Sequence, residues 1–280
     1  MIVSFDIETA AKAPEDRTGG DYQIGITCIA SAIKDADVRL WHGGEEPTWG
    51  EAKLAPRMSA EQCKDFAAYL VEMNRRGYHP FAVNGLGFDF QVLAAECRDE
   101  LVWWDNLREL ALASIDPAFQ HLCEHGWMIG VEAMLNGIGQ TKTEGMDGKK
   151  AVEMWQGSRA DQDKVLEYVT QDAAGPLAVY EEAKARGFIA WVTKSGDKRK
   201  WYPVWMVDGQ MLEPPEVTYK PWEAPPISYL DDLDYYLQRF HGGQDRRLLT
   251  CAEALTLPLP RPPTWLDDPW TREMFAGWAL

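Results

Sequence analysis

The sequence contains few cysteines, histidines and basic residues, and it has no long hydrophobic run. Its five cysteines are scattered over 280 residues, odd in number and without a Cys-x-x-Cys pair. This distribution argues against a disulfide framework or a zinc ribbon, and it predicts a reducing, cytoplasmic compartment, or the host cytoplasm if the protein is viral. No segment offers the ~18 consecutive apolar residues that cross a membrane, and Asp6 interrupts any N-terminal signal pattern. We therefore expect no membrane span.

Basic residues are outnumbered by acidic ones, since 28 lysines and arginines stand against 44 aspartates and glutamates, a net charge of −16. Broad binding to duplex phosphates requires many cations, so this balance argues against it. The balance does not exclude an enzyme that grips one strand end, because bound metal ions and a local groove can supply positive charge. With 46% hydrophobic and 26% charged residues, the composition is typical of a soluble globular protein.

Residues 1–186 carry the pattern of one α/β domain. Ser59 followed by Gln62 is a capping-box pattern, which marks the start of an amphipathic helix. The expected strands are 2–10, 22–33, 36–43 and 79–84, and the expected helices are 59–74, 88–97 and most of 106–184. Three strands, a helix, a strand and then helices predict a mixed β-sheet flanked by helices.

Residues 187–280 differ in composition and are interpreted as a C-terminal extension. "FIAWVTKSGDKRKWYPVWMV" predicts a β-hairpin that turns near 195–197. "EPPEVTYKPWEAPP" and "LPLPRPPTW" hold most of the prolines and predict an extended wrap with short helices such as 229–240. The lysines and tryptophans of the hairpin suit either stacking on single-stranded nucleobases or inward packing of the rings beneath a basic turn. Both interpretations are open from the sequence, so the extension is given no role.

The strand "IVSFDIETA" ends in two acidic residues. Side chains alternate across a strand, so Asp6 and Glu8 share one face while Val3, Phe5 and Ile7 share the other. Two buried carboxylates on one face repel each other unless they are protonated or bridged by a cation. A divalent metal ion is the natural partner, although Asp-x-Glu alone also occurs by chance on solvated edges.

Two later segments place further acids at defined positions. In "VNGLGFDF" (83–90), Asn84 ends a strand, two glycines permit a sharp turn, and Asp89 enters the first turn of a helix, where an ordinary capping role is the alternative. In "YVTQDAAG" (168–175), Tyr168 and Asp172 are four residues apart and lie on one helix face, away from the apolar stripe. Taken alone, such a pair is an ordinary surface contact.

The ordered set of Asp6, Glu8, Asp89 and Asp172 resembles the DEDD superfamily of 3′–5′ exonucleases. "FDIET", "NGLGFD" and "YVTQD" are similar to the three motifs of its Y-x-x-x-D branch, which includes the proofreading exonuclease domain of family-B DNA polymerases. The resemblance covers about residues 1–185 and implies a ribonuclease H-like fold. No polymerase motif is present and the chain is too short for a polymerase domain, so a stand-alone nuclease is expected.

The resemblance also implies a two-metal site. Two Mg²⁺ or Mn²⁺ ions would be bound by the carboxylates of Asp6, Glu8, Asp89 and Asp172. Asp6 would bridge both ions, Glu8 and Asp172 would serve mainly the ion on the nucleophile side, and Asp89 would help to hold the other. Hard oxygen ligands suit these ions, and paired metals stabilise both the attacking and the leaving oxygens of a phosphodiester.

The remaining site residues follow from the same resemblance. Tyr168 would orient the attacking water through its hydroxyl group, Asn84 and Phe88 would position the terminal nucleotides, and Thr9 would contact the chain end through its backbone. The implied partner is the 3′ end of a single strand, with DNA expected over RNA. The lysine-containing loop 137–150 is expected to be an ordinary solvated loop, with folding over a nucleic-acid strand as the alternative.

Three other functions remain open from the sequence. A 3′–5′ exoribonuclease would use the same residues, because the choice of sugar depends on the shape of the pocket. "SFDIET" also loosely resembles the nucleophile motif of haloacid dehalogenase-like phosphatases, but position 8 is Glu where a second Asp is wanted. A non-catalytic nucleic-acid-binding module is expected to lose an acid, and all four are present here.

Overall fold

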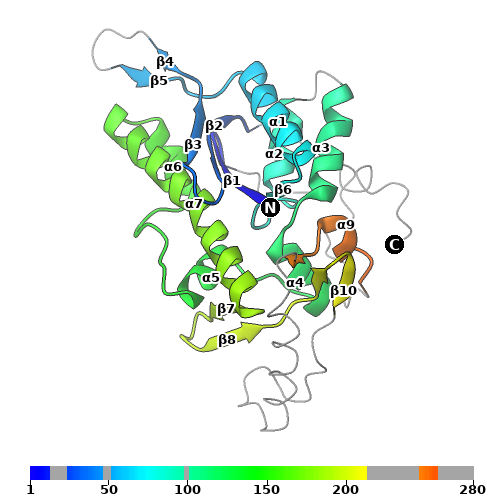
Figure 1. The fold of residues 1–280 in the computed structure, drawn as a ribbon. Coiled ribbons are helices and arrows are strands. Elements are labelled where there is room, and N and C mark those ends of the chain that lie inside the picture. Colours follow the sequence, from blue (N-terminus) through cyan, green and yellow to red (C-terminus); the bar gives the residue numbers. More distant parts are fainter. Residues whose placement is uncertain (13–23, 47–51, 98–100, 213–245, 258–280) are drawn as a thin grey trace.

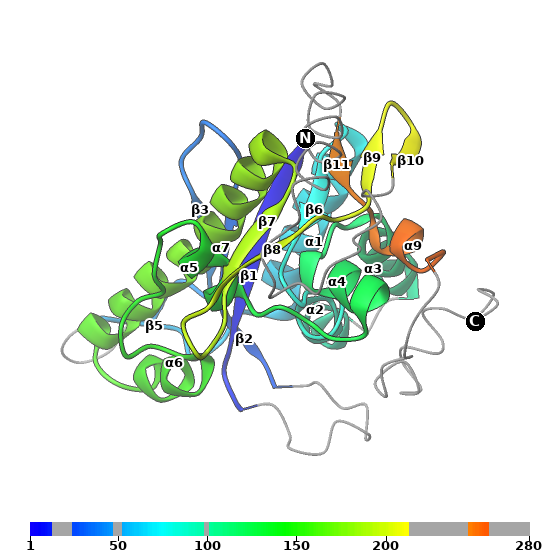
Figure 2. The ribbon, with the colours of Figure 1, turned by 90° about the horizontal axis from the view of Figure 1, so that it is seen from below.

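The computed structural model describes residues 1–12, 24–46, 52–97, 101–212 and 246–257, and Figure 1 shows their arrangement. The two proline-rich segments and the helix predicted at 229–240 lie outside these residues. A central sheet is covered by helices on both faces, as the views in Figures 1 and 2 agree. The prediction of a mixed sheet flanked by helices is confirmed.

The central sheet has the strand order β3-β2-β1-β6. Its strands are β1 (Ile2–Thr9), β2 (Ile26–Ala32), β3 (Arg39–His42) and β6 (His79–Phe81). β2 runs antiparallel to both of its neighbours, whereas β6 runs parallel to β1. In the β1–β2 register, Asp6 lies opposite Ala30 and Glu8 lies opposite Cys28. The two acids therefore share a face with small side chains, which leaves room beside them.

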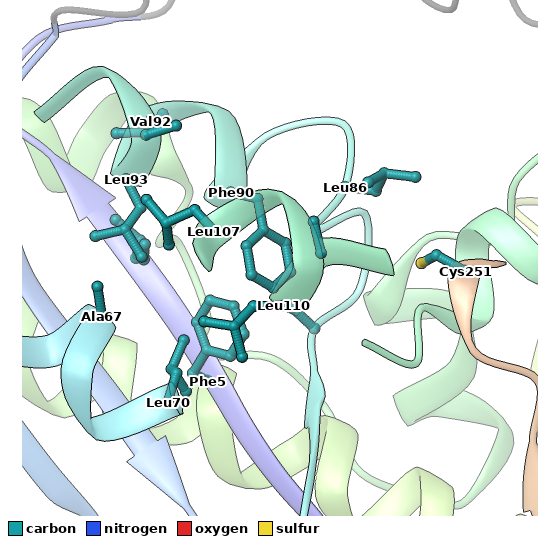
Figure 3. Close-up of a cluster of buried hydrophobic side chains, with 14 of the residues drawn as sticks. Phe5, Ala67, Leu70, Leu86, Phe90, Val92, Leu93, Leu107, Leu110 and Cys251 are labelled. Atoms are coloured by element: carbon teal, nitrogen blue, oxygen red, sulfur yellow. The ribbon is translucent and has the colours of Figure 1, made fainter. Parts of the chain in front are cut away.

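One face of the sheet is covered by the first three helices. They are α1 (Ala60–Arg75), α2 (Asp89–Glu96) and α3 (Leu101–Ala113). The predicted capping box begins α1, since the Ser59 hydroxyl oxygen accepts from the backbone N–H of Gln62 and the Gln62 side chain accepts from the backbone N–H of Ser59. The Phe5 ring lies 5.6 Å from Phe66 and 5.4 Å from Phe90, between ring centroids. Figure 3 shows part of this core, in which the odd-numbered residues of β1 are buried.

The opposite face of the sheet is covered mainly by α7, a continuous helix from Arg159 to Arg186. It packs over β1 and β2, so the even-numbered side chains of β1 point toward it. Three shorter helices precede α7: α4 (Pro117–His125), α5 (Val131–Gly137) and α6 (Gly148–Trp155). Because the apolar side chains of β1 occupy the other face, its carboxylates are directed to the space between β1 and α7.

The described residues after 186 pack against the same cores. They form β7 (Ile189–Val192), β8 (Lys198–Trp201), β9 (Trp205–Val207), β10 (Gln210–Leu212), β11 (Arg247–Leu248) and α9 (Cys251–Ala254). β7 pairs with β8 in an antiparallel hairpin, and a small sheet has the order β10-β9-β11. Trp205 and Leu248 are fully buried in one cluster with Ile2 and Phe81 of the first part of the chain. The division into 1–186 and 187–280 stays a prediction.

Two smaller features complete the description. β4 (Glu45–Glu46) pairs with β5 (Lys53–Leu54) as a short ribbon beside the main sheet. Within the described ranges, no helix is both long and apolar enough to cross a membrane. All five cysteines are buried as thiols.

Candidate metal centre

Three carboxylates converge between β1 and α7. Asp6 and Glu8 come from β1, and Asp172 comes from the middle of α7. One oxygen atom from each of the three lies within 4.8 Å of the others. The exposed fractions of Glu8 and Asp172 are only 6% and 7%. This spacing allows one cation to contact all three groups at once.

The electrostatics of the cluster call for added positive charge. Burial, and then the nearby charge of Asp172, raise the pKa of Asp6 to about 8, against the opposing effect of Lys142. Burial, and then the charge of Asp6, raise the pKa of Glu8 well above its usual range. Such groups hold their protons at neutral pH unless a cation compensates the charge. The donor set consists of carboxylate oxygens, which are the ligands that Mg²⁺ and Mn²⁺ prefer.

Asp89 lies outside this group of three but belongs to the same electrostatic site. It is the first residue of α2, its exposed fraction is 4%, and burial followed by the charge of Asp6 raises its pKa well above the usual range. Its Oδ1 atom is buried and has no hydrogen-bond partner within the described part of the chain. A buried carboxylate oxygen without a partner is costly, and a bound cation removes that cost. The four acids together therefore fit divalent metal ions.

Tyr168 lies one helical turn before Asp172 on α7 and is buried. Burial, and then the charge of Asp172, raise the pKa of its phenol above the ordinary value. The hydroxyl group therefore keeps its proton at neutral pH. It can orient a neighbouring oxygen by hydrogen bonding, but it is not a base at that pH.

Lys142 extends from the segment between α5 and α6 into the cluster. Its Nζ atom donates to Asp172 Oδ2 at 2.7 Å and to the Tyr168 hydroxyl at 3.1 Å. The neighbouring Thr143 donates to Gln171 of α7. The expectation of an ordinary solvated loop is therefore wrong for Lys142, because this part of the loop is hydrogen-bonded to α7. The expectation is correct for Lys149 and Lys150, which are exposed at the start of α6.

The turn before α2 holds the predicted substrate residues. Asn84 has a φ of 63° in the left-handed region, which is uncommon for a residue with a side chain. A Cβ atom at Gly87 would lie 2.5 Å from Asn84 Oδ1, so a larger residue there would displace the Asn84 side chain. Phe88 is half-buried at the N-terminus of α2 and packs on the core of the first face. This turn brings Asn84 and Phe88 next to Asp89.

Thr9 ends β1 after an irregularity in the register between Glu8 and Thr9. Its hydroxyl group donates to the Ala11 carbonyl at 2.9 Å, and the residue is buried. The structure thus brings together Asp6, Glu8, Tyr168 and Asp172, with Asp89 electrostatically coupled and Thr9 at the same strand end. The roles of these residues stay predictions.

Most of the aromatic rings of the hairpin after α7 pack inward. Trp201 and Trp205 are buried, Trp191 is half-buried, and the exposed positions are the turn residues 194–197 and the lysines at 198 and 200. On β7 and β8, Trp191 lies opposite Arg199, whereas Lys198 and Lys200 lie in register with Val192 and Ala190 on the other face. Of the two interpretations of this segment, inward packing of the rings beneath a basic turn describes the structure.

Comparisons with known proteins give a distant similarity in structure. No protein-family model and no curated protein matches the sequence. Among solved structures, the fold is similar to that of the family B DNA polymerase from the hyperthermophilic archaeon Pyrobaculum calidifontis, with a TM-score of 0.48 and 14% sequence identity. The similarity covers 66% of this chain and 24% of the polymerase chain, so the present protein spans only a fraction of that polymerase. A similarity of this size carries no inference about activity.

Proposed function

We propose that the protein is a metal-dependent 3′–5′ exonuclease that removes nucleotides from the 3′ end of a nucleic-acid strand, single-stranded DNA in preference to RNA. The observation that carries the proposal is the convergence of Asp6, Glu8 and Asp172, from segments more than 160 residues apart, with ligand atoms within 4.8 Å of one another. The motif order described above supports a nuclease over other metal-dependent hydrolases.

The acids would hold two Mg²⁺ or Mn²⁺ ions. Asp6, Glu8 and Asp172 would supply three of the ligand groups, since their oxygens lie close together. The Oδ1 atom of Asp89 has no hydrogen-bond partner among the described residues, which supports Asp89 as the fourth ligand. When bound, such ions lower the pKa of a coordinated water and stabilise charge on the attacking and leaving oxygens of a phosphodiester.

The protein's own residues orient the reactants. Tyr168 keeps its proton, so its hydroxyl group positions the attacking water and does not deprotonate it. Lys142 holds that hydroxyl at 3.1 Å and places a positive charge where the negative phosphate of the strand must lie. Asn84 and Phe88, on the turn that leads into Asp89, would contact the terminal nucleotides, and Thr9 would contact the chain end through its backbone.

The test uses one strand sequence made as DNA and as RNA, labelled at the 3′ or the 5′ end. The purified protein is incubated with Mg²⁺, Mn²⁺ or EDTA, and the products are separated on a denaturing gel. We expect immediate loss of the 3′ label, a ladder from the 5′ label, and no reaction in EDTA. Asp6→Ala should abolish the reaction, whereas Glu181→Ala, which removes the ion-pair partner of the exposed Lys34, should leave it unchanged.

Two results contradict the proposal. Strands that stay intact with both metals would exclude nuclease activity on these substrates. Degradation that Asp6→Ala leaves unchanged would show that the activity belongs to another site or to a contaminant. Faster digestion of RNA than of DNA would instead assign the protein as an exoribonuclease with the same site.

A further inference from the structure

The backbone of the turn that leads into Asp89 is hydrogen-bonded to a side chain from a distant part of the sequence. Asp116, the residue before α4, is buried, with an exposed fraction of 2%. Its Oδ1 atom accepts the backbone N–H of Asn84 at 3.0 Å, and its Oδ2 atom accepts the backbone N–H of Leu86 at 3.3 Å. These contacts cross 32 and 30 residues of sequence.

The same carboxylate also caps α4. Oδ1 accepts from the backbone N–H groups of Ala118 and Phe119 at 3.0 and 3.1 Å, as in an ordinary N-cap. A helix cap needs only those two bonds. The bonds to Asn84 and Leu86 are additional, and they tie the α4 terminus to the turn.

The turn needs such support because its backbone is strained. Asn84 adopts a φ of 63°, in the left-handed region that residues with a side chain seldom occupy. The turn is also tight, since a Cβ atom added at Gly85 would lie 2.6 Å from the Ala82 Cβ. The turn is also continuous with α2, since the Phe90 N–H donates to the Gly85 carbonyl at 3.0 Å and the Gln91 side chain donates to the Leu86 carbonyl. A shift of the turn therefore moves the start of α2, where Asp89 lies.

We propose that Asp116 is a positioning residue of the metal centre: by holding the backbone of Asn84 and Leu86, it sets the direction in which the Asp89 carboxylate enters the site. That Asp89 takes part in catalysis rests on the proposed function, whereas the connection from Asp116 to Asp89 rests on the hydrogen bonds alone. Removal of a group that orients a metal ligand typically lowers metal affinity by about 10- to 100-fold.

Asp116→Asn tests the proposal with little change in shape. An asparagine keeps one oxygen acceptor, but in either orientation of the amide its NH₂ group faces at least one backbone N–H that the aspartate accepts. Ser59→Ala is the matched control, because it removes the N-cap of α1 without contact to the turn. Circular dichroism and thermal unfolding establish that each variant is folded.

The readout is Mn²⁺ affinity, measured without nucleic acid by electron paramagnetic resonance of free Mn²⁺. We expect the dissociation constant to rise about tenfold or more in Asp116→Asn and to stay within about twofold of the wild type in Ser59→Ala. In the strand assay, high Mn²⁺ should restore most of the activity of Asp116→Asn, whereas it should not rescue Asp89→Ala.

The outcomes separate this inference from the proposed function. Unchanged Mn²⁺ affinity in a folded Asp116→Asn overturns the positioning role, whatever the wild type does to a strand. A wild type that binds Mn²⁺ but digests no strand overturns the nuclease proposal. The positioning role is then decided by the Mn²⁺ affinity of Asp116→Asn alone. A wild type that binds no Mn²⁺ overturns both.

Discussion

At the scale of single residues, the site was predictable wherever a local pattern fixes the direction of a side chain. The alternation of β1 places Asp6 and Glu8 on one face because Val3, Phe5 and Ile7 occupy the other. Lys142 and Asp116 were not predicted as site residues, because their partners lie 26 to 32 residues away in the chain. Periodicity carries no signal for such contacts. The only sequence cue to Lys142 was its place in a glycine-rich loop between helices.

Lys142→Met should lower the turnover of a labelled strand. The methionine keeps most of the length of the side chain but removes the bonds to Asp172 and Tyr168. Hydrogen bonds to charged groups contribute about 1.5–3 kcal/mol, so the expected loss in rate is roughly 10- to 100-fold. Lys149→Met, at an exposed position seven residues further along, should retain the wild-type rate. Equal rates for the two variants would remove Lys142 from the mechanism.

His121 should make the stability of the protein fall at acidic pH. Burial lowers its pKa to about 3, and its Nδ1–H donates to the Trp127 carbonyl at 2.7 Å in the neutral ring. The unfolded chain takes up this proton below pH 6.5 and the folded chain does not, so stability is lost as pH falls from 6.5 toward 3.

His121→Phe removes this proton and keeps an aromatic ring in the cluster, while His125 is present in both proteins. Urea unfolding at pH 7 and pH 5 measures the effect. The stability of the wild type relative to the variant should drop by about 2 kcal/mol between these two pH values. The same pH dependence in both proteins would show that His121 is protonated in the folded state.

At the scale of elements, strong local signals predicted the segments of three or more residues in the main sheet and missed the two-residue strands. The capping box at Ser59 and the alternation of β1 are encoded within a few residues, and both appear in the structure. β4, β5 and β11 have two residues each, too few for alternation to show, and β11 pairs with β9 about 40 positions earlier. Their formation depends on tertiary packing, which no local pattern records.

The contact between α5 and β7 should make Gly137 irreplaceable. A Cβ atom at this position would lie 2.1 Å from the Ala190 carbonyl oxygen, which belongs to backbone and cannot easily move. Gly137→Ala should therefore cost about 1–3 kcal/mol of unfolding free energy, or more. It should also lower nuclease turnover, because α5 leads directly into the loop that carries Lys142.

Gly148→Ala provides the matched control for this substitution. No atom lies within 4 Å of a Cβ atom at Gly148, which begins α6, so the change should be neutral or slightly stabilising. Urea unfolding of the two variants measures the difference. If Gly137→Ala is as stable as Gly148→Ala, α5 does not pack on β7 as described.

At the scale of the whole molecule, the described residues after 186 complete the hydrophobic cores of the first part. Trp205 is fully buried, and its Nε1–H donates to the Gly187 carbonyl at 3.2 Å. The sequence showed that these residues are rich in tryptophan, but it did not show which surface they cover, because that depends on side chains such as Ile2 and Phe81 at the other end of the chain.

Trp205→Ala should destabilise the whole protein. Removing a buried tryptophan typically costs about 3–5 kcal/mol, because apolar contacts are lost and a cavity remains. Met211→Ala, on the neighbouring β10 and 40% exposed, should change the stability by less than about 1 kcal/mol. Cooperative urea unfolding monitored by far-ultraviolet circular dichroism measures both. A small effect of Trp205→Ala would show that the extension is not part of the core.

The central claim is that side chains distant in sequence form one site for divalent metal ions. Crystals grown with Mn²⁺ test it most directly, since Mn²⁺ scatters anomalously and its position can be located without reference to the protein. The account predicts anomalous peaks bounded by the carboxylates of Asp6, Glu8, Asp89 and Asp172. A well-ordered site at millimolar Mn²⁺ with no peak among these four groups would contradict it.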